Sequence, residues 1–226
     1  MNIQRICLFS LFILFSSAAF GQERISVELY GGPSIGYVDG QGTGPAEELL
    51  FVQELGYHAG LRLLGRVSNS AQVVVEGEFH RRPVGTRVRF HDGNVVEHSN
   101  TGYSNNFGNY ALGIRVSPKN LPAGFYIQPS VGFALSREAP GFFAGAGQPQ
   151  STLMKTSLSA RIEAGVKLDV GGNYVLVGVR HQQGFQELDS RIAEFPQQHI
   201  DIDFRSRGSY SGLFVGFGIP TRWFDR

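Results

Sequence analysis

A histidine, a serine and a glutamate near the end of the chain have the side-chain types that nucleophilic catalysis requires. His181 and Ser211 stand at positions of the same parity in two neighbouring alternating segments, and Glu187 follows in the loop after the first segment. A serine hydrolase needs its imidazole within hydrogen-bond reach of the hydroxyl, because the imidazole takes the proton when the oxygen attacks. These residues keep a hydrolase open as an alternative function.

A second set of residues that could take part in chemistry consists of charged side chains that alternate with apolar ones. The set contains four acids and five bases, so the charges nearly cancel. An isolated buried charge is very costly, but opposite charges can be buried when they pair and keep their hydrogen bonds. We therefore expect a structural ion-pair network inside the fold rather than a catalytic centre. The members are Glu28, Arg62, Glu76, Glu78, Arg115, Arg161, Glu163, Lys167 and Arg180.

Metal, cofactor and nucleic-acid chemistry have little support. The six histidines do not show a His-x-x-x-His spacing on one face, and the net charge of +1 gives no argument for a nucleic-acid partner. His91 with Asp92, or Asp201 with Asp203, could hold a cation in a loop, but turn formation and solvation account for such residues more simply. We expect no metal, no cofactor and no catalytic activity.

The N-terminus has the features of an export signal. A basic residue, Arg5, precedes an apolar stretch from Ile6 to Phe15, and small residues lead to a cleavage site before Gln22. The stretch is about half the ~20 residues that a spanning helix needs. Residues 1–21 are therefore expected to be a signal peptide. The single cysteine, Cys7, lies within it, so the mature chain of residues 22–226 would contain no disulfide.

Alternation with a period of two, which is typical of β-strands, recurs eight times along the mature chain. Each segment is about ten residues long, which is the length that a tilted strand needs to cross a bilayer. Long and short connections alternate between the segments, as an up-and-down barrel with both ends on one side requires. Asp92-Gly93 in one long connection predicts a hairpin that extends its flanking strands. The expected strands are Arg24–Val38, Leu55–Leu64, Ala71–Arg82, Phe107–Val116, Phe125–Ser136, Thr152–Leu168, Tyr174–Gln182 and Tyr210–Pro220.

Glycines on the polar face of these segments indicate which side is inside. On the water-facing surface of a soluble, lipocalin-like barrel they would only weaken the strands. In the lumen of a narrow membrane barrel they leave room for long Arg and Glu side chains. We therefore expect lipid against the apolar face, with aromatic residues, including Tyr126, Tyr174, Tyr37, Tyr57, Phe107 and Tyr210, marking both membrane interfaces. The glycines are Gly60, Gly113, Gly132, Gly178, Gly212, Gly216 and Gly218.

With these patterns, the mature chain resembles the small outer-membrane β-barrels of the OmpA-transmembrane, OmpX, OmpW and PorT-like types. The last strand carries the sharpest feature. Tyr210, Gly212, Val215 and Phe217 fit the polar-x-Gly-x-x-apolar-x-apolar signal that the barrel-assembly machinery recognises in such proteins. The resemblance implies an all-β, eight-stranded antiparallel transmembrane barrel in the outer membrane of a Gram-negative cell, with both termini in the periplasm.

The resemblance implies a structural or surface-interaction role, with outer-membrane lipid and the assembly machinery as partners. Apolar residues in the long connections could bind an extracellular partner of unknown identity, or could pack the loops together. Two alternatives stay open: a soluble ligand-binding barrel, and a lipid A-modifying hydrolase that uses His181, Ser211 and Glu187. The sequence "HQQGFQ" does not match the His-x-Ser motif of the lipid A deacylases. The apolar loop residues are Leu49, Leu50, Phe51, Phe142, Phe143, Ile192 and Phe195.

Overall fold

A computed structural model describes most of the chain beyond the expected signal peptide. The described residues are 25–43, 46–53, 55–90, 95–98, 104–118, 122, 124–137, 155–195 and 200–221. Every regular element within these ranges is a β-strand, and none of these residues forms a helix that could span a membrane. The expected signal peptide, residues 1–21, lies outside the described residues.

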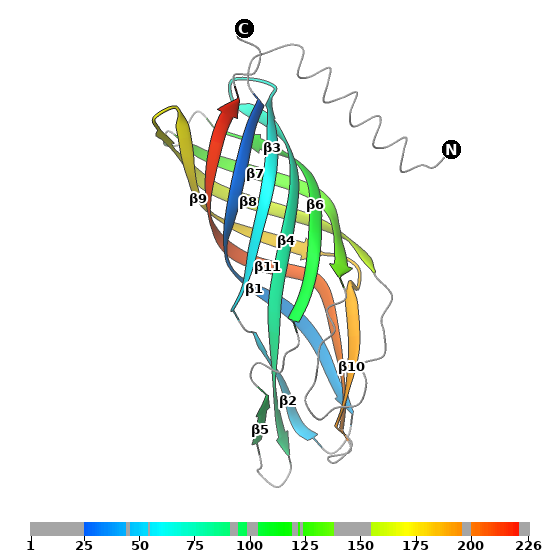
Figure 1. Cartoon of the computed structure of the whole chain (residues 1–226). Helices are drawn as coiled ribbons and strands as arrows, with labels where there is room; N and C mark the ends of the chain where they lie inside the picture. The colour runs from blue at the N-terminus through cyan, green and yellow to red at the C-terminus, as the bar shows by residue number, and fades with distance from the viewer. Residues whose placement is uncertain are drawn as a thin grey trace, which may run out of the picture.

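Eight strands form a closed antiparallel barrel (Figure 1). Each strand pairs with the next one in the barrel, and β1 closes the cylinder against β11, with Ile25 opposite Thr221 and Leu29 opposite Phe217. This arrangement confirms the predicted eight-stranded up-and-down barrel. The barrel strands are β1 (Ile25–Thr43), β3 (Leu55–Arg66), β4 (Ala71–Phe90), β6 (Ser104–Val116), β7 (Phe125–Arg137), β8 (Thr156–Val170), β9 (Asn173–Gly184) and β11 (Ile200–Thr221).

Short connections join the strands at one end of the barrel, here called the turn side. The tightest is the turn between β8 and β9, where Gly171 and Gly172 have φ angles of +57° and +89°. Two successive positive φ angles suit a two-residue turn between twisted strands, and glycine adopts them at little cost. The opposite end, here called the loop side, carries the long connections. The predicted alternation of connection lengths is confirmed for the described strands.

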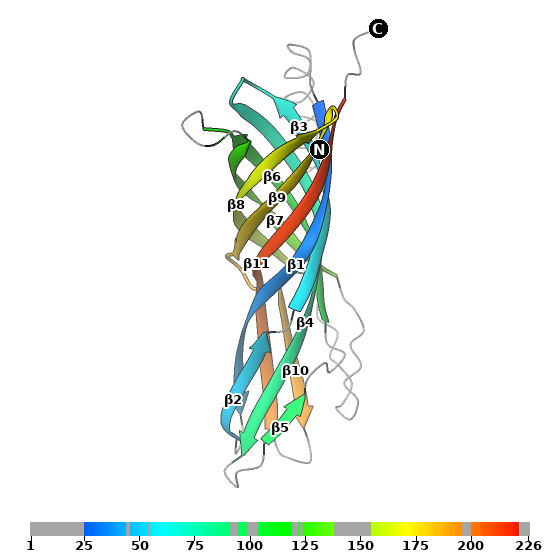
Figure 2. The same ribbon diagram turned by 90° about the vertical axis from the view of Figure 1, so that its left-hand side faces the viewer.

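The loop side is built from strands and not from loops alone (Figure 2). The end of β1 and the start of β11 continue beyond the barrel as a pair, and β10 (Asp189–Phe195) pairs with β11 there. These three segments form a first ribbon, the β10 leaf. The end of β4 pairs with β2 (Ala46–Gln53) and β5 (Val95–His98), which forms a second ribbon, the β2 leaf. The β4–β5 pairing confirms the predicted hairpin, although Asp92 and Gly93 lie outside the described residues. The sequence pattern did not reveal β2, β10 or the first half of β11.

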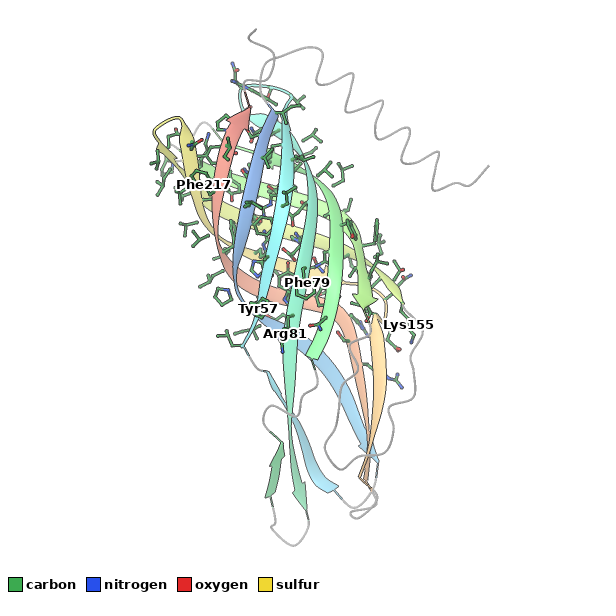
Figure 3. The ribbon with its side chains drawn as sticks, viewed as in Figure 1. Tyr57, Phe79, Arg81, Lys155 and Phe217 are labelled. Atoms are coloured by element: carbon green, nitrogen blue, oxygen red, sulfur yellow. The ribbon has the colours of Figure 1, made fainter. Side chains whose placement is uncertain are left out.

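The outward surface of the barrel is apolar and its interior is polar. Large apolar side chains such as Leu29, Val131 and Val215 are 58–63% exposed, whereas Glu28, Arg62 and Glu163 are at most 1% exposed. Figure 3 shows the outward side chains between Phe217, toward the turn side, and Tyr57, Phe79, Arg81 and Lys155, toward the loop side. The predicted orientation is correct, and a soluble lipocalin-like barrel would require the reverse.

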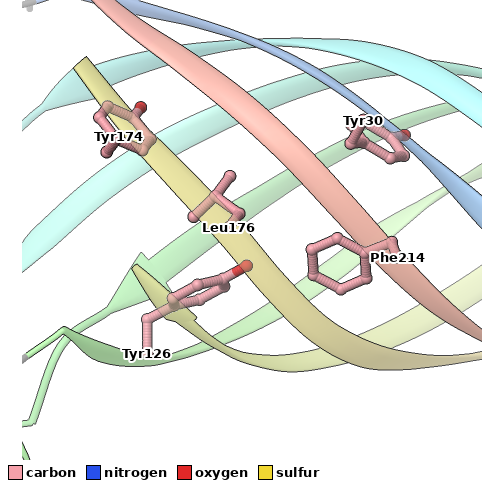
Figure 4. Packing of buried hydrophobic residues seen from close by; sticks show 5 residues of the cluster. All are labelled: Tyr30, Tyr126, Tyr174, Leu176 and Phe214. Carbon is pink, nitrogen blue, oxygen red and sulfur yellow. The ribbon is translucent and has the colours of Figure 1, made fainter. Parts of the chain in front are cut away.

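Aromatic rings fill the space beside several of the inward glycines. A Cβ atom on Gly60 would overlap the ring of Tyr30, and one on Gly178 would lie 2.6 Å from the ring of Phe214. The rings belong to a buried cluster of Tyr30, Tyr126, Tyr174, Leu176 and Phe214 (Figure 4). The sequence-based expectation that these glycines make room chiefly for Arg and Glu side chains is therefore wrong in detail.

The buried rings also correct the predicted aromatic girdles. Tyr126, Tyr174, Phe107 and Tyr210 were expected at the membrane interfaces, but all four are at most 3% exposed and point into the barrel. Their inward parity places them there, because successive side chains of a strand point to opposite faces. Tyr37 and Tyr57 are exposed on the outward surface, as expected.

Adding one methyl group at an inward glycine tests this packing. We expect Gly60→Ala to destabilise the barrel by roughly 1–3 kcal/mol, because its Cβ would overlap the Tyr30 ring and approach the carbonyl of Gly77. Gly77→Ala is the matched control, since its Cβ would meet only the ring of Tyr110 at 3.9 Å. Urea unfolding in detergent micelles measures the difference. Equal unfolding midpoints for the two variants would contradict the proposed packing.

Candidate functional site

The centre of the barrel is an ion-pair network built around Arg62. Its guanidinium extends from β3 and contacts carboxylates from three other strands: Glu28 of β1 at 3.3 Å, Glu76 of β4 at 2.6 Å, and Glu163 of β8. The arginine side chain is fully buried. Because a guanidinium presents five donors in a fixed planar fork, one arginine can bind several carboxylates at once.

Three more arginines complete the network. Arg115 donates to Glu28 at 2.8 Å and to Gln128 at 3.0 Å. Arg180 donates to Glu163 at 2.6 Å and also contacts Glu78. Arg161 pairs with Glu76 and donates to Gln182 at 2.7 Å. Four arginines thus balance four glutamates, and burial is compatible with these charges because each has an opposite partner.

Tyrosine hydroxyls supply further hydrogen bonds to the buried carboxylates. Tyr30 donates to Glu78 at 3.0 Å, Tyr126 to Glu163 at 2.9 Å, and Tyr174 to Glu28 at 2.9 Å, while Tyr210 also donates to Glu78. These tyrosines were not expected to belong to the network. Their inward parity was the signal that could have found them.

The same rings stack against the arginines. The guanidinium carbon of Arg62 lies 3.9 Å from the ring centroid of Tyr30, and that of Arg115 lies 4.2 Å from the ring centroid of Tyr126. Arg180 lies 4.9 Å from the ring centroid of Phe214. These cation–π distances are short, and the interaction is strengthened where water is excluded. Several inward positions therefore place a glycine, a ring and a guanidinium next to one another.

Lys167 does not join this network. Its side chain is 41% exposed, lies 3.4 Å from Asp169, and sits over the Tyr174 ring at 4.3 Å from the centroid. Lys167 has the inward parity, but it stands close to the turn-side end of β8, where the lumen opens. Its inclusion in the expected lumen charge network is therefore wrong, although it lies at the turn-side mouth of the lumen. The other eight expected charges are brought together.

A group of rings lies above the ions on the loop side. His80 stacks on Phe107 with ring centroids 4.6 Å apart and contacts Tyr210 at 4.4 Å, while Ser34 Oγ lies 2.9 Å from its Nε2. His58 stacks parallel to His80 at 6.3 Å. With the ions below them, these rings fill the lumen in the described part of the barrel. A hollow of about 710 Å³ opens at the turn-side mouth, beside Arg66 and Lys167.

The residues considered for hydrolysis lie on the outward surface. His181 Nδ1 is 2.9 Å from Ser211 Oγ, and the Tyr37 hydroxyl is 3.0 Å from the same oxygen. Glu187 instead forms a salt bridge of 2.5 Å with Lys155. The structure therefore brings together the histidine and the serine but places the expected acid elsewhere. Tyr37 was not anticipated as part of this group. A hollow of about 270 Å³ lies beside it, lined by Tyr37, His181, Gln183, Arg207 and Ser209.

The residues of the expected assembly signal occupy both faces of β11. Tyr210 is buried and Gly212 faces the lumen, whereas Val215 and Phe217 are exposed on the outward surface. The strand continues beyond Phe217 to Thr221. Among the described residues, no group of three histidine, cysteine or acidic side chains is arranged to hold a metal ion.

Comparison with known proteins defines the class at the level of the fold. OprG from Pseudomonas aeruginosa, an outer membrane protein, is similar with a TM-score of 0.53 and 10% identity over 88% of this chain and 98% of OprG. AlkL and Neisserial surface protein A are similar over 91% and 86% of this chain, with identities of 11% and 10% and TM-scores of 0.46 and 0.43. No protein-family model matches the sequence, and no curated protein sequence matches it.

The fold is that of the small eight-stranded outer-membrane barrels. At these identities the likeness shows the architecture alone.

Replacing the central arginine tests the network. Arg62→Met should destabilise the barrel by about 3–5 kcal/mol, because Glu28, Glu76 and Glu163 would each lose a buried partner. The control is Lys167→Met, which removes a partly exposed charge at the turn-side end of the barrel. It should change the free energy of unfolding by less than about 1 kcal/mol. Urea unfolding monitored by far-UV circular dichroism measures the stability of both variants. Similar losses in the two variants would refute a network centred on Arg62.

Proposed function

We propose that this protein is an integral outer-membrane barrel of a Gram-negative cell with a structural or surface-interaction role. The observation that carries the proposal is the reversed polarity of the barrel: apolar side chains such as Leu29, Val131 and Val215 face outward, and paired ions fill the centre. Such a surface is stable against hydrocarbon and poorly suited to water. In this proposal the lumen and the leaves have no catalytic role.

The closed lumen argues against a pore. Arg62 and Arg180 both bond to Glu163 in the centre of the barrel, and stacked rings cover these groups on the loop side. Eight-stranded barrels are narrow enough for side chains to fill. The network therefore acts as an internal support that fixes the distance between opposite strands.

The two leaves support the surface-interaction role. They extend the barrel on the loop side, which in outer-membrane barrels faces the outside of the cell. Residues on extended connections above a rigid scaffold are well placed to contact other molecules. The apolar residues Leu49, Leu50, Phe51, Ile192 and Phe195 fall in β2 and β10, where only the backbone is described, and Phe142 and Phe143 lie outside the described residues. Both chain ends would lie in the periplasm, and β11 would present the assembly signal during insertion.

Conductance across a planar bilayer tests the closed lumen. The wild-type protein should add no stepwise current, because bonded side chains occupy the centre of the lumen. A double variant, Arg62→Ala with Arg180→Ala, removes two of the largest central side chains and should produce measurable current if it folds. Folding is checked by the electrophoretic shift of unheated barrel protein. Steady channel openings in the wild type would overturn the proposal of a closed barrel.

Labelling of single cysteines on intact cells tests the orientation. The expected mature chain has no cysteine, so each introduced thiol is unique. A membrane-impermeant maleimide should label Gln186→Cys, which is exposed on the loop side. It should not label Ser117→Cys, which is exposed on the turn side, until the outer membrane is permeabilised. The opposite labelling pattern would place the leaves in the periplasm.

A further inference from the structure

An irregularity in strand pairing creates a polar site on the outward surface. Gly36 of β1 pairs with Tyr210 of β11, but Val38 pairs with Ser206, so residues 207–209 stand opposite Tyr37 alone. Gly208 has a φ angle of +76°, which suits a bulge. Bulges redirect side chains and are frequent beside active sites. Here the bulge brings Tyr37, Arg207 and Ser209 around one hollow.

His181 lines this hollow, and Ser211 lies beside it, so that the two residues have the geometry of a nucleophile and its base. Their 2.9 Å contact lies within the range expected for an activated serine. The Tyr37 hydroxyl lies 3.0 Å from the same serine oxygen. The Tyr37 ring also meets the imidazole edge-on, with centroids 6.1 Å apart and planes at 61°, a favourable arrangement for two rings.

The position of the pair along the barrel indicates what could reach it. From the turn side toward the loop side, Ser211 and His181 are the first polar outward residues on their strands. On β11 the apolar outward positions before Ser211 are Ile219, Phe217, Val215 and Leu213, and on β9 those before His181 are Val175, Val177 and Val179. Beyond them, toward the loop side, the hollow presents Arg207. A lipid whose acyl chain lay along the apolar residues would therefore place its ester group near Ser211 and its headgroup near Arg207. A guanidinium fits a phosphate group well.

We propose that Ser211 and His181 hydrolyse an acyl ester of a phosphorylated membrane lipid. This activity goes beyond the structural role proposed above and belongs to a separate surface of the barrel. It requires no other group than water, which is available at the boundary between hydrocarbon and headgroups. The lipid could be a glycerophospholipid or a lipopolysaccharide, since both carry acyl esters and phosphate.

The reaction proceeds in two steps. Ser211 Oγ attacks the ester carbonyl carbon as His181 Nδ1 takes the hydroxyl proton. The carbon–oxygen bond to the alcohol then breaks, and His181 returns that proton to the departing alkoxide, which leaves an acyl-serine. Water attacks the acyl-serine while His181 takes one of its protons and passes it to Ser211 Oγ, and the fatty acid is released. The Tyr37 hydroxyl donates to the oxyanion that forms in each step.

The test uses the full-length mature protein folded in detergent micelles. A fluorophosphonate probe should label the wild type covalently, and p-nitrophenyl octanoate should be hydrolysed. Ser211→Ala should abolish labelling and His181→Gln should lower the hydrolysis rate by roughly 10²–10⁴-fold, the usual contribution of a general base. Tyr37→Phe should lower the rate by up to about 10²–10³-fold, the usual cost of losing one oxyanion donor. Ser117→Ala, an exposed serine at the opposite end, should retain wild-type behaviour.

Lipid specificity is tested with phosphatidylglycerol vesicles and with lipopolysaccharide micelles, and mass spectrometry detects released fatty acid. Release from either lipid that depends on Ser211 supports the proposal and identifies the source. Wild-type protein that shows the electrophoretic shift of a folded barrel but neither reacts with the probe nor hydrolyses any of these esters would overturn it. Activity that persists in Ser211→Ala would also overturn it. Neither result would affect the closed barrel, whose tests are conductance and cysteine labelling.

Discussion

The fold depends on the pairing of ions that have been removed from water. Arg62 is fully buried, and its contacts with Glu28, Glu76 and Glu163 come from three other barrel strands. Burying one such charge alone would cost several kcal/mol, a large share of the net stability of a typical domain. The barrel can therefore keep a polar centre only if its strands hold the arginines and glutamates in one fixed arrangement. Strand register and ion pairing consequently require each other.

Glycine, aromatic ring and guanidinium form a repeated unit around this centre. Gly60 leaves space for the Tyr30 ring, the ring supports the Arg62 guanidinium, and the Tyr30 hydroxyl bonds to Glu78. Tyrosine thus supplies volume, a face for a cation and a donor for a carboxylate in one side chain. This explains how a lumen rich in glycine can still be densely filled.

Alternation in the sequence was sufficient to predict the eight barrel strands, their order and the side that faces inward. These properties depend on side-chain parity, which is visible in a single strand. Contacts between strands that are not neighbours in the barrel are not visible in the same way, so the contacts of Tyr174 with Glu28 and of Tyr210 with Glu78 were missed. Lys167 was misplaced because parity gives the face of a strand but not the depth within the lumen. The grouping of Tyr37 with Arg207 around one hollow depends on a bulge, which changes the parity rule locally.

The distribution of the network over the strands has a consequence for how the barrel assembles. Glu28 belongs to β1, the first strand, yet it bonds to Arg115 of β6 and to Tyr174 of β9. An incomplete sheet that lacks β1 would leave Arg115 and Tyr174 without Glu28, and one that lacks β11 would leave Glu78 without the Tyr210 hydroxyl. Partly formed barrels should therefore be poorly populated. Closure of β1 against β11 and formation of the interior ion pairs should occur together, as a single cooperative event.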